Sequence, residues 1–116
     1  MKRLSGLIVA AVTSLAACSS SVSTGPAVAI TATDTACQVA TTTLSPGSHT
    51  FEVSNQGSTT TEVYVYAPGD KVVAEKENIG PGTTARFTAK MKAGSYQIAC
   101  KPGQKGTGIR QTVTVS

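Results

Sequence analysis

The chain has 116 residues with a formal net charge of +4, from 10 Lys or Arg, 6 Asp or Glu and a single His that is counted as neutral. Part of the positive charge belongs to Lys2 and Arg3, and no basic run with interleaved aromatic residues occurs. The composition therefore does not indicate a nucleic-acid-binding protein. With one His and no nucleophile elbow, phosphate loop or zinc motif, we expect no enzyme activity.

The N-terminus has the layout of a secretory signal peptide over residues 1–17. Lys2 and Arg3 are followed by an uncharged, apolar run of about 14 residues, which is shorter than the roughly 20 that a spanning helix needs. The sequence Leu-Ala-Ala-Cys, which ends at Cys18, resembles the lipobox of bacterial lipoproteins. That resemblance implies a diacylglyceryl group on Cys18. We expect an anchor in the cell membrane or outer membrane, with the rest of the chain periplasmic or at the cell surface.

The segment after the proposed anchor is rich in small polar residues. Residues 18–26 contain the sequence SSSVSTGP, which is typical of a flexible tether. The remainder, residues 27–116, has the length of one small domain.

Residues 27–116 show the pattern of an all-β fold. Short runs rich in Val, Ile, Thr, Tyr and Phe alternate with turns that contain Gly, Pro, Asn or Asp, which favours a Greek-key β-sandwich. The predicted strands are Val28–Thr33, Gln38–Thr43, His49–Ser54, Glu62–Tyr66, Lys71–Glu75, Thr83–Lys90, Ser95–Cys100 and Ile109–Val115. Alternation within them predicts a core of Phe51, Val53, Val63, Val65, Phe87, Ile98, Val113 and Val115.

The C-terminal segment Ala93–Gly103, with Gly94-Ser95-Tyr96 and a late Cys100, resembles the last hairpin of cupredoxins, and Val113–Val115 resembles their final strand. This resemblance implies a cupredoxin-like sandwich. A blue copper site needs two His, one Cys and a weak axial ligand. At the equivalent positions, Glu62 replaces the first His, Gly103 replaces the second His, and Gly108 or Ile109 replaces the axial Met. The single histidine, His49, lies ahead of these positions, and we expect it to be a surface strand residue. The blue-copper ligand set is therefore missing.

A more specific resemblance is to the cupredoxin-like domain of EfeO, the periplasmic component of bacterial iron-uptake systems. The segments that carry it are Cys37–Val39, Pro46–Phe51, Asn55–Glu62, Glu75–Gly82 and Gly94–Cys100. The resemblance implies a metal-handling module that binds copper or iron and serves an iron or copper transport system. By position, the implied ligands are Cys37, Glu62, Glu75, Glu77 and Cys100. Full-length EfeO proteins continue into a larger helical domain with a His-x-x-Glu motif, and the resemblance here covers the cupredoxin-like domain alone.

Other interpretations of the same residues remain open. Cys37 and Cys100 could form a disulfide in an oxidising compartment, which would enclose roughly 60 residues and add about 4 kcal/mol in the chain-entropy model. A disulfide and a pair of thiolate ligands exclude each other. The carboxylates could equally form solvated ion pairs with Lys71, Lys76 or Arg86. Regular alternation also points Glu62 away from a core that contains Val63, so a ligand role there requires a bulge.

The sequence thus supports two hypotheses of function. The first is a lipid-anchored metal-binding accessory protein, and it requires the acidic side chains and both sulfurs to meet at one end of the sandwich. The second is a disulfide-stabilised envelope module that binds a protein or polysaccharide without metal.

Overall fold

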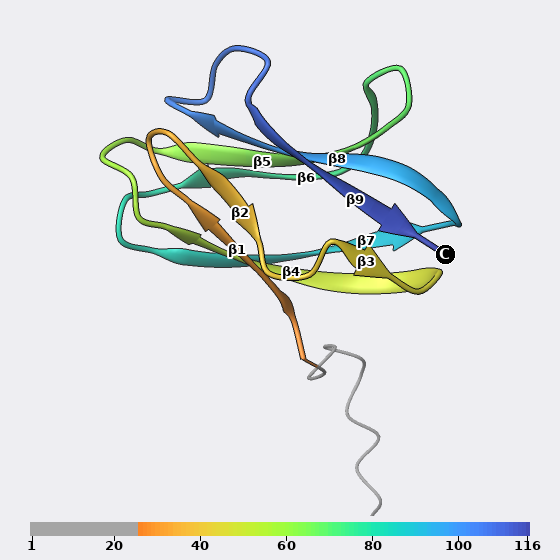
Figure 1. The fold of residues 1–116 in the computed structure, drawn as a ribbon. Helices are drawn as coiled ribbons and strands as arrows, with labels where there is room; N and C mark the ends of the chain where they lie inside the picture. The colour runs from red at the N-terminus through yellow and green to blue at the C-terminus, as the bar shows by residue number, and fades with distance from the viewer. Residues whose placement is uncertain (1–25) are drawn as a thin grey trace, which may run out of the picture.

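A computed structural model describes residues 26–116, and its strands form two packed layers (Figure 1). In this part of the chain there are nine strands and no helix. The strands are β1 (Val28–Ala32), β2 (Cys37–Val39), β3 (Thr43–Leu44), β4 (Gly47–Asn55), β5 (Thr61–Ala67), β6 (Lys71–Ile79), β7 (Thr84–Met91), β8 (Gly94–Pro102) and β9 (Ile109–Val115). The predictions for residues 1–25, including the signal peptide and the lipidated Cys18, lie outside the described residues.

The two sheets have the mixed topology of a sandwich. One sheet has four strands in the order β2-β1-β4-β7, and the other has five in the order β3-β9-β8-β5-β6. β1 pairs with β4 in parallel and β3 pairs with β9 in parallel, whereas the other neighbouring strands within each sheet pair antiparallel. The all-β sandwich prediction is confirmed. Residues 26–116 contain no helix that is long and apolar enough to cross a bilayer.

The core lies between the two sheets and follows the predicted alternation. Seven of the eight predicted core residues are buried, and Phe51 is fully inaccessible to solvent. Phe87 is only half-buried because β7 is an edge strand, and its ring stacks on Phe51 with a centroid distance of 5.4 Å. The prediction missed several buried side chains whose neighbours do not alternate clearly, namely Ile30, Leu44, Ile79, Met91 and Tyr96.

The predicted strand Gln38–Thr43 is wrong as a single element. β2 and β3 belong to different sheets, so the chain crosses between the layers after Val39. The Val39 amide donates a hydrogen bond of 2.7 Å to Oε1 of Gln111 on β9, a contact that ties the two sheets together at the crossing. A pattern of apolar and polar residues cannot reveal such a crossing, because both short strands alternate in the same way.

Strand β6 extends four residues beyond its predicted end at Glu75. Its pairing with β5 shifts register twice, between Thr61 and Val63 and again between Val65 and Tyr66. Asn78 has a φ of 59°, in the left-handed region that Asn tolerates better than most residues. The bulges lie on an exposed edge strand, where they oppose pairing with another chain.

Candidate functional site

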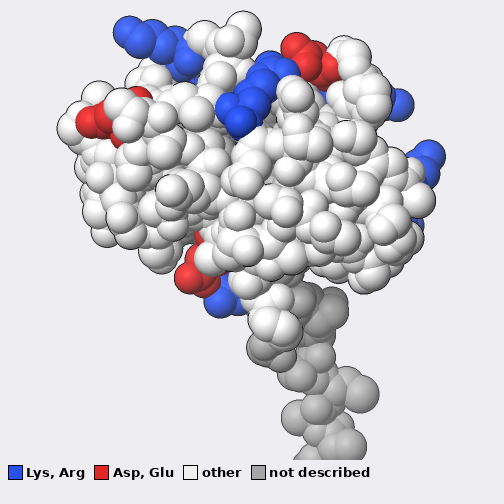
Figure 2. Space-filling view, viewed as in Figure 1, with Lys and Arg blue, Asp and Glu red and all other residues white. Residues whose placement is uncertain are grey.

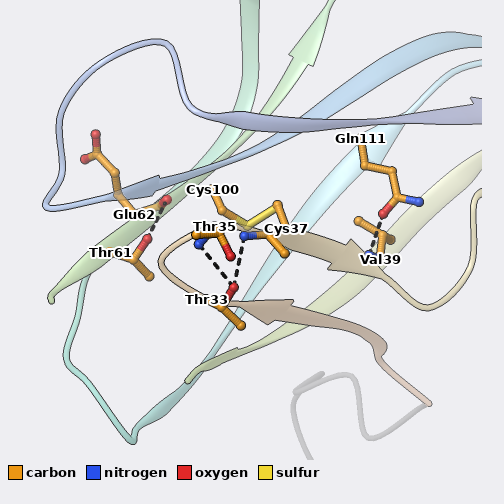
Figure 3. The surroundings of a disulfide bond; sticks show 9 residues. Thr33, Thr35, Cys37, Val39, Thr61, Glu62, Cys100 and Gln111 are labelled. Atoms are coloured by element: carbon orange, nitrogen blue, oxygen red, sulfur yellow. Dashed lines mark hydrogen bonds between the residues drawn. A yellow bond between two sulfur atoms is a disulfide. The ribbon is translucent and has the colours of Figure 1, made fainter. Parts of the chain in front are cut away.

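Cys37 and Cys100 are joined in a disulfide, with 5.5 Å between their Cα atoms (Figure 3). Cys37 begins β2 of the four-stranded sheet, and Cys100 lies near the end of β8 in the five-stranded sheet. The bond therefore connects the two layers through the core, where both residues are buried. Of the two alternatives for these cysteines, the structure has the disulfide.

The turn before Cys37 is fixed by Thr33. Its backbone amide donates to the Ala36 carbonyl, and its hydroxyl oxygen accepts hydrogen bonds from the amides of Thr35 and Ala36 at 3.3 and 2.9 Å. Threonine favours this local arrangement because its side chain satisfies turn amides that would otherwise need water. The turn directs Cys37 back toward the core and toward β8.

Glu62 lies on the opposite side of the five-stranded sheet from the disulfide. Its neighbour Val63 is fully buried and pairs with Cys100, so the alternation of β5 directs Glu62 outward. Figure 3 shows its carboxylate pointing away from the sulfur atoms. The β5–β6 pairing does contain a bulge beside this residue, but it does not turn Glu62 toward the core.

Glu75 and Glu77 are exposed on the edge strand β6, and Glu75 pairs across the strands with Tyr64 of β5. Side-chain hydrogen bonding to Glu75 is the largest cause that raises the pKa of Tyr64 above its ordinary value of 10.0. Desolvation and the negative charges of Glu62, Glu75 and Glu77 act in the same direction. The three predicted carboxylates thus all raise the pKa of one phenol, on the outside of the sandwich.

Two tyrosines and two cations form a layered cluster on the same outer face. The rings of Tyr64 and Tyr66 stack with centroids 5.4 Å apart. Nζ of Lys101 lies 3.9 Å from the Tyr64 ring centroid and donates a 2.8 Å hydrogen bond to the Tyr66 hydroxyl. The guanidinium carbon of Arg110 lies 4.6 Å from the Tyr66 ring centroid, a typical cation–π distance.

The sequence analysis placed Tyr64 and Tyr66 in the predicted strand Glu62–Tyr66 and gave no role to Lys101 or Arg110. The available signal was the i, i+2 spacing of the tyrosines, which places both rings on one face. The partners come from β8 and β9, and only the register of those strands brings Lys101 and Arg110 over the rings.

The positions equivalent to blue-copper ligands have other roles in this chain. Cys100 forms the disulfide with Cys37. Gly103 and its neighbour Gln104 have φ values of 71° and 55° and form the turn that follows β8. His49 is half-buried on β4, and its Nε2 lies 2.6 Å from the Ser45 carbonyl oxygen.

The five predicted metal ligands do not come together. The sulfurs bind each other inside the sandwich, and the carboxylates lie outside it, with a sheet between the two groups. Within residues 26–116, no three His, Cys, Asp or Glu side chains are grouped so that they could hold a metal ion. A disulfide sulfur is a poor metal ligand, so the residues present do not fit a mixed thiolate–carboxylate site in this oxidised form.

Comparison with known proteins agrees with the architecture. Residues 6–115 match the family model of the cupredoxin-like domain. The chain belongs to the cupredoxin-like family. Among solved structures, this cupredoxin-like chain is similar to reduced auracyanin from Roseiflexus castenholzii, with a TM-score of 0.62 and 16% identity over 76% of this chain and 94% of the other. It is also similar to an azurin from Methylomonas sp. strain J, with a TM-score of 0.56 and 17% identity over 76% and 95% of the two chains.

Curated relatives of this cupredoxin-like chain include the iron uptake system component EfeO of Escherichia coli K12 and of Shigella flexneri. Each is 35% identical over 75 residues, which cover 65% of this chain and 20% of the relative. The chain thus spans about a fifth of the length of these relatives. The resemblance to the EfeO-type cupredoxin-like domain is confirmed.

Proposed function

We propose that this cupredoxin-like chain is an extracytoplasmic accessory module of a metal-handling system, with copper or iron as its cargo and a lipidated Cys18 as its membrane anchor. The observation that carries the proposal is the 35% identity to EfeO over 75 residues. The EfeO name concerns iron uptake, and the similarity covers the cupredoxin-like region of this chain. A transport system that receives the metal is the partner expected on this basis.

The proposal puts the capture of cargo on the outer face of the five-stranded sheet. With both sulfurs in the disulfide, the candidate ligands that remain are the carboxylates of Glu62, Glu75 and Glu77, which are not grouped as a metal site and would have to move together to hold an ion. Carboxylate oxygens suit hard cations such as ferric iron better than soft ones. Such an open surface fits transient capture better than a permanent cofactor site.

Metal titration of the full-length chain, with and without reductant, tests the proposal. We expect stoichiometric binding of ferric iron, supplied as a weak citrate complex, or of cupric ion by the oxidised chain. The combined variant Glu62→Gln, Glu75→Gln, Glu77→Gln should lose this binding. Glu52→Gln is the matched control, because Glu52 lies in the other sheet and pairs with Arg86.

Each other result has a definite meaning. Binding only after reduction, lost in a Cys37→Ser, Cys100→Ser variant, would transfer the ligand role to the thiolates. No stoichiometric copper or iron in either redox state would end the metal proposal.

The anchor is tested separately by detergent phase partition of the expressed full-length chain. The wild-type chain should enter the detergent phase, and Cys18→Ser should move it to the aqueous phase because the acyl chains supply the membrane affinity. Equal partition of the two would contradict lipidation.

The second candidate function is a disulfide-stabilised envelope binding module that takes no metal. The buried Cys37–Cys100 bond favours it, since that bond accounts for both cysteines without any ligand role. A negative metal titration would leave this candidate.

A further inference from the structure

A pocket of about 270 Å³ opens between the β5–β6 turn and the start of β8. Tyr66, Asp70, Ser95 and Gln97 are among its lining residues. β8 runs from Gly94 to Pro102, so these residues lie at the opposite end of the strand from Cys100 and from the disulfide. The pocket is thus separate from the disulfide, and it shares Tyr66 with the tyrosine–cation cluster described above.

Arg110 fixes the polar side chains of this pocket. Its Nη1 donates to Oδ1 of Asp70 at 2.6 Å and to Oε1 of Gln97 at 3.1 Å, and its Nη2 reaches Oδ2 of Asp70 at 3.4 Å. Its own Nε donates to the Thr107 carbonyl at 2.9 Å, which holds the guanidinium in place over Tyr66. Asp70 and Gln97 are therefore oriented before any ligand arrives, which reduces the entropy lost on binding.

The bonds to Arg110 also determine which donors and acceptors are left for a ligand. Because the Gln97 oxygen faces Arg110, its amide nitrogen offers two N–H donors. Each Asp70 oxygen keeps a further lone pair, and the Ser95 hydroxyl can donate and accept. A carboxylate beside an amide donor suits a hydroxyl group, which donates to one and accepts from the other.

The charge of the pocket selects against ionic ligands. Arg110 neutralises Asp70 directly, and this pairing holds the pKa of the Asp70 carboxyl below its ordinary value. Figure 2 shows basic and acidic side chains close together over this side of the molecule. A paired site with little net charge, polar planar groups and tyrosine in its lining favours a neutral, hydroxyl-rich ligand over an anion or an amine.

From this geometry we propose that the pocket binds one neutral sugar residue of a polysaccharide. Its volume suits a single ring, and it lies on the five-stranded layer, whereas the described chain enters β1 from beyond the four-stranded layer (Figure 1). A chain tethered through its N-terminus would thus turn the pocket away from the tether. The proposal is independent of metal binding.

Saturation-transfer NMR with the full-length chain tests this proposal, using galactose, mannose, rhamnose and N-acetylglucosamine as probes. We expect transfer to at least one of them, and Gln97→Ala should weaken it about fivefold through the loss of hydrogen bonds. Gln38→Ala is the matched control, because Gln38 is also an exposed strand glutamine but lies on β2. Gln97 is exposed, so its replacement leaves the core intact.

A second variant keeps the test independent of Gln97. Asp70→Asn retains a side chain that tolerates the φ of 56° at this position but removes the carboxylate acceptor, and it should also reduce transfer. Transfer to none of the four sugars would overturn the proposal. Transfer unchanged by both variants, or displacement of the sugar by putrescine, would overturn it as well, since an amine ligand requires an unneutralised Asp70.

Discussion

At the scale of single residues, Tyr64 shows how alternation and register create a special environment from ordinary parts. Alternation puts its ring on the outer face of β5, register places Glu75 opposite it, and Lys101 covers the ring. Neither partner is adjacent in sequence. The phenol therefore experiences a hydrogen bond and several carboxylates although it lies at the surface.

Glu75→Gln should lower the pKa of Tyr64, because it removes the largest cause of its elevation. In the wild-type chain the protonated phenol is favoured in the folded state. The protonated Tyr64 phenol thus contributes fully to the free energy of unfolding at pH values below its ordinary pKa of 10.0. This contribution is lost as the pH rises through the higher pKa of the folded state. Alkaline titration followed by the NMR signal of the Tyr64 ring measures the shift, with Glu52→Gln as control. An identical titration in wild type and Glu75→Gln would contradict the hydrogen bond.

Asn55 is a second residue whose role exceeds that of a turn marker. Its buried amide nitrogen donates to the carbonyls of Thr59 and Ile79, both at 2.9 Å, and its oxygen accepts from the Gly57 amide. The side chain thus joins the β4–β5 loop to the end of β6.

Asn55→Ala should lower the free energy of unfolding by about 3 kcal/mol, because buried groups lose their partners. Denaturant unfolding measures this loss, and Gln56→Ala serves as the neighbouring exposed control. A loss no larger than that of the control would show that water replaces the amide without cost.

Among the structural elements of residues 26–116, β2 and β3 are the shortest strands, and the disulfide holds β2. β2 has three residues and β3 has two, so few backbone hydrogen bonds hold this crossing segment. The bond from Cys37 to Cys100, together with the contact from Val39 to Gln111, attaches the segment to the five-stranded sheet.

Cys37→Ser, Cys100→Ser should reduce the free energy of unfolding by about 4 kcal/mol, the chain-entropy value for a loop of 63 residues. Denaturation curves with and without reductant measure this. Reductant should destabilise the wild-type chain and leave the double variant unchanged. If complete reduction left the denaturation midpoint of the wild-type chain unchanged, this would contradict the structural role of the disulfide.

At the scale of the whole molecule, exposed hydrogen bonds and an ion pair fix two turns that lie outside the hydrophobic core. Asp34 of the β1–β2 turn accepts hydrogen bonds from the amide and hydroxyl of Ser58, at 2.8 and 2.7 Å, and these bonds lower the pKa of its carboxyl. Asp70 of the β5–β6 turn is paired with Arg110, with the same effect on its pKa. The two contacts lie at opposite ends of the sandwich.

The stability of the molecule should therefore fall at acid pH. A carboxyl whose pKa is lowered on folding contributes fully above its unfolded value of 3.8, and this contribution is lost as the pH falls through the lower folded-state value. Denaturation midpoints measured across this range should decline less in an Asp34→Asn, Asp70→Asn variant than in wild type. Parallel declines would show that other carboxyls control the acid response.

Much of the fold could be predicted from the sequence because its signals are local. The alternation of apolar and polar residues, together with the turn residues, indicated the sandwich and most of its core. The segments Asn55–Glu62, Glu75–Gly82 and Gly94–Cys100 supported the same fold through their resemblance to known cupredoxin-like domains. The candidate site was predicted less well. The resemblance implied Cys37 and Cys100 as metal ligands, whereas their expected oxidising compartment pointed to the disulfide that the structure has. Position in a motif also does not say on which side of a sheet Glu62 lies relative to the cysteines.

The layered β architecture, the family resemblance and the two possible states of the cysteines could thus all be inferred from the amino-acid sequence. The packing of the two sheets shows in addition that the sulfurs meet inside the sandwich while Glu62, Glu75 and Glu77 lie outside it. Only the tertiary structure decided that Arg110 joins Asp70 and Gln97 beside a pocket. The physical reason is that alternation fixes the face of each residue within its own strand, whereas strand order and register, set by long-range pairing, fix which faces meet.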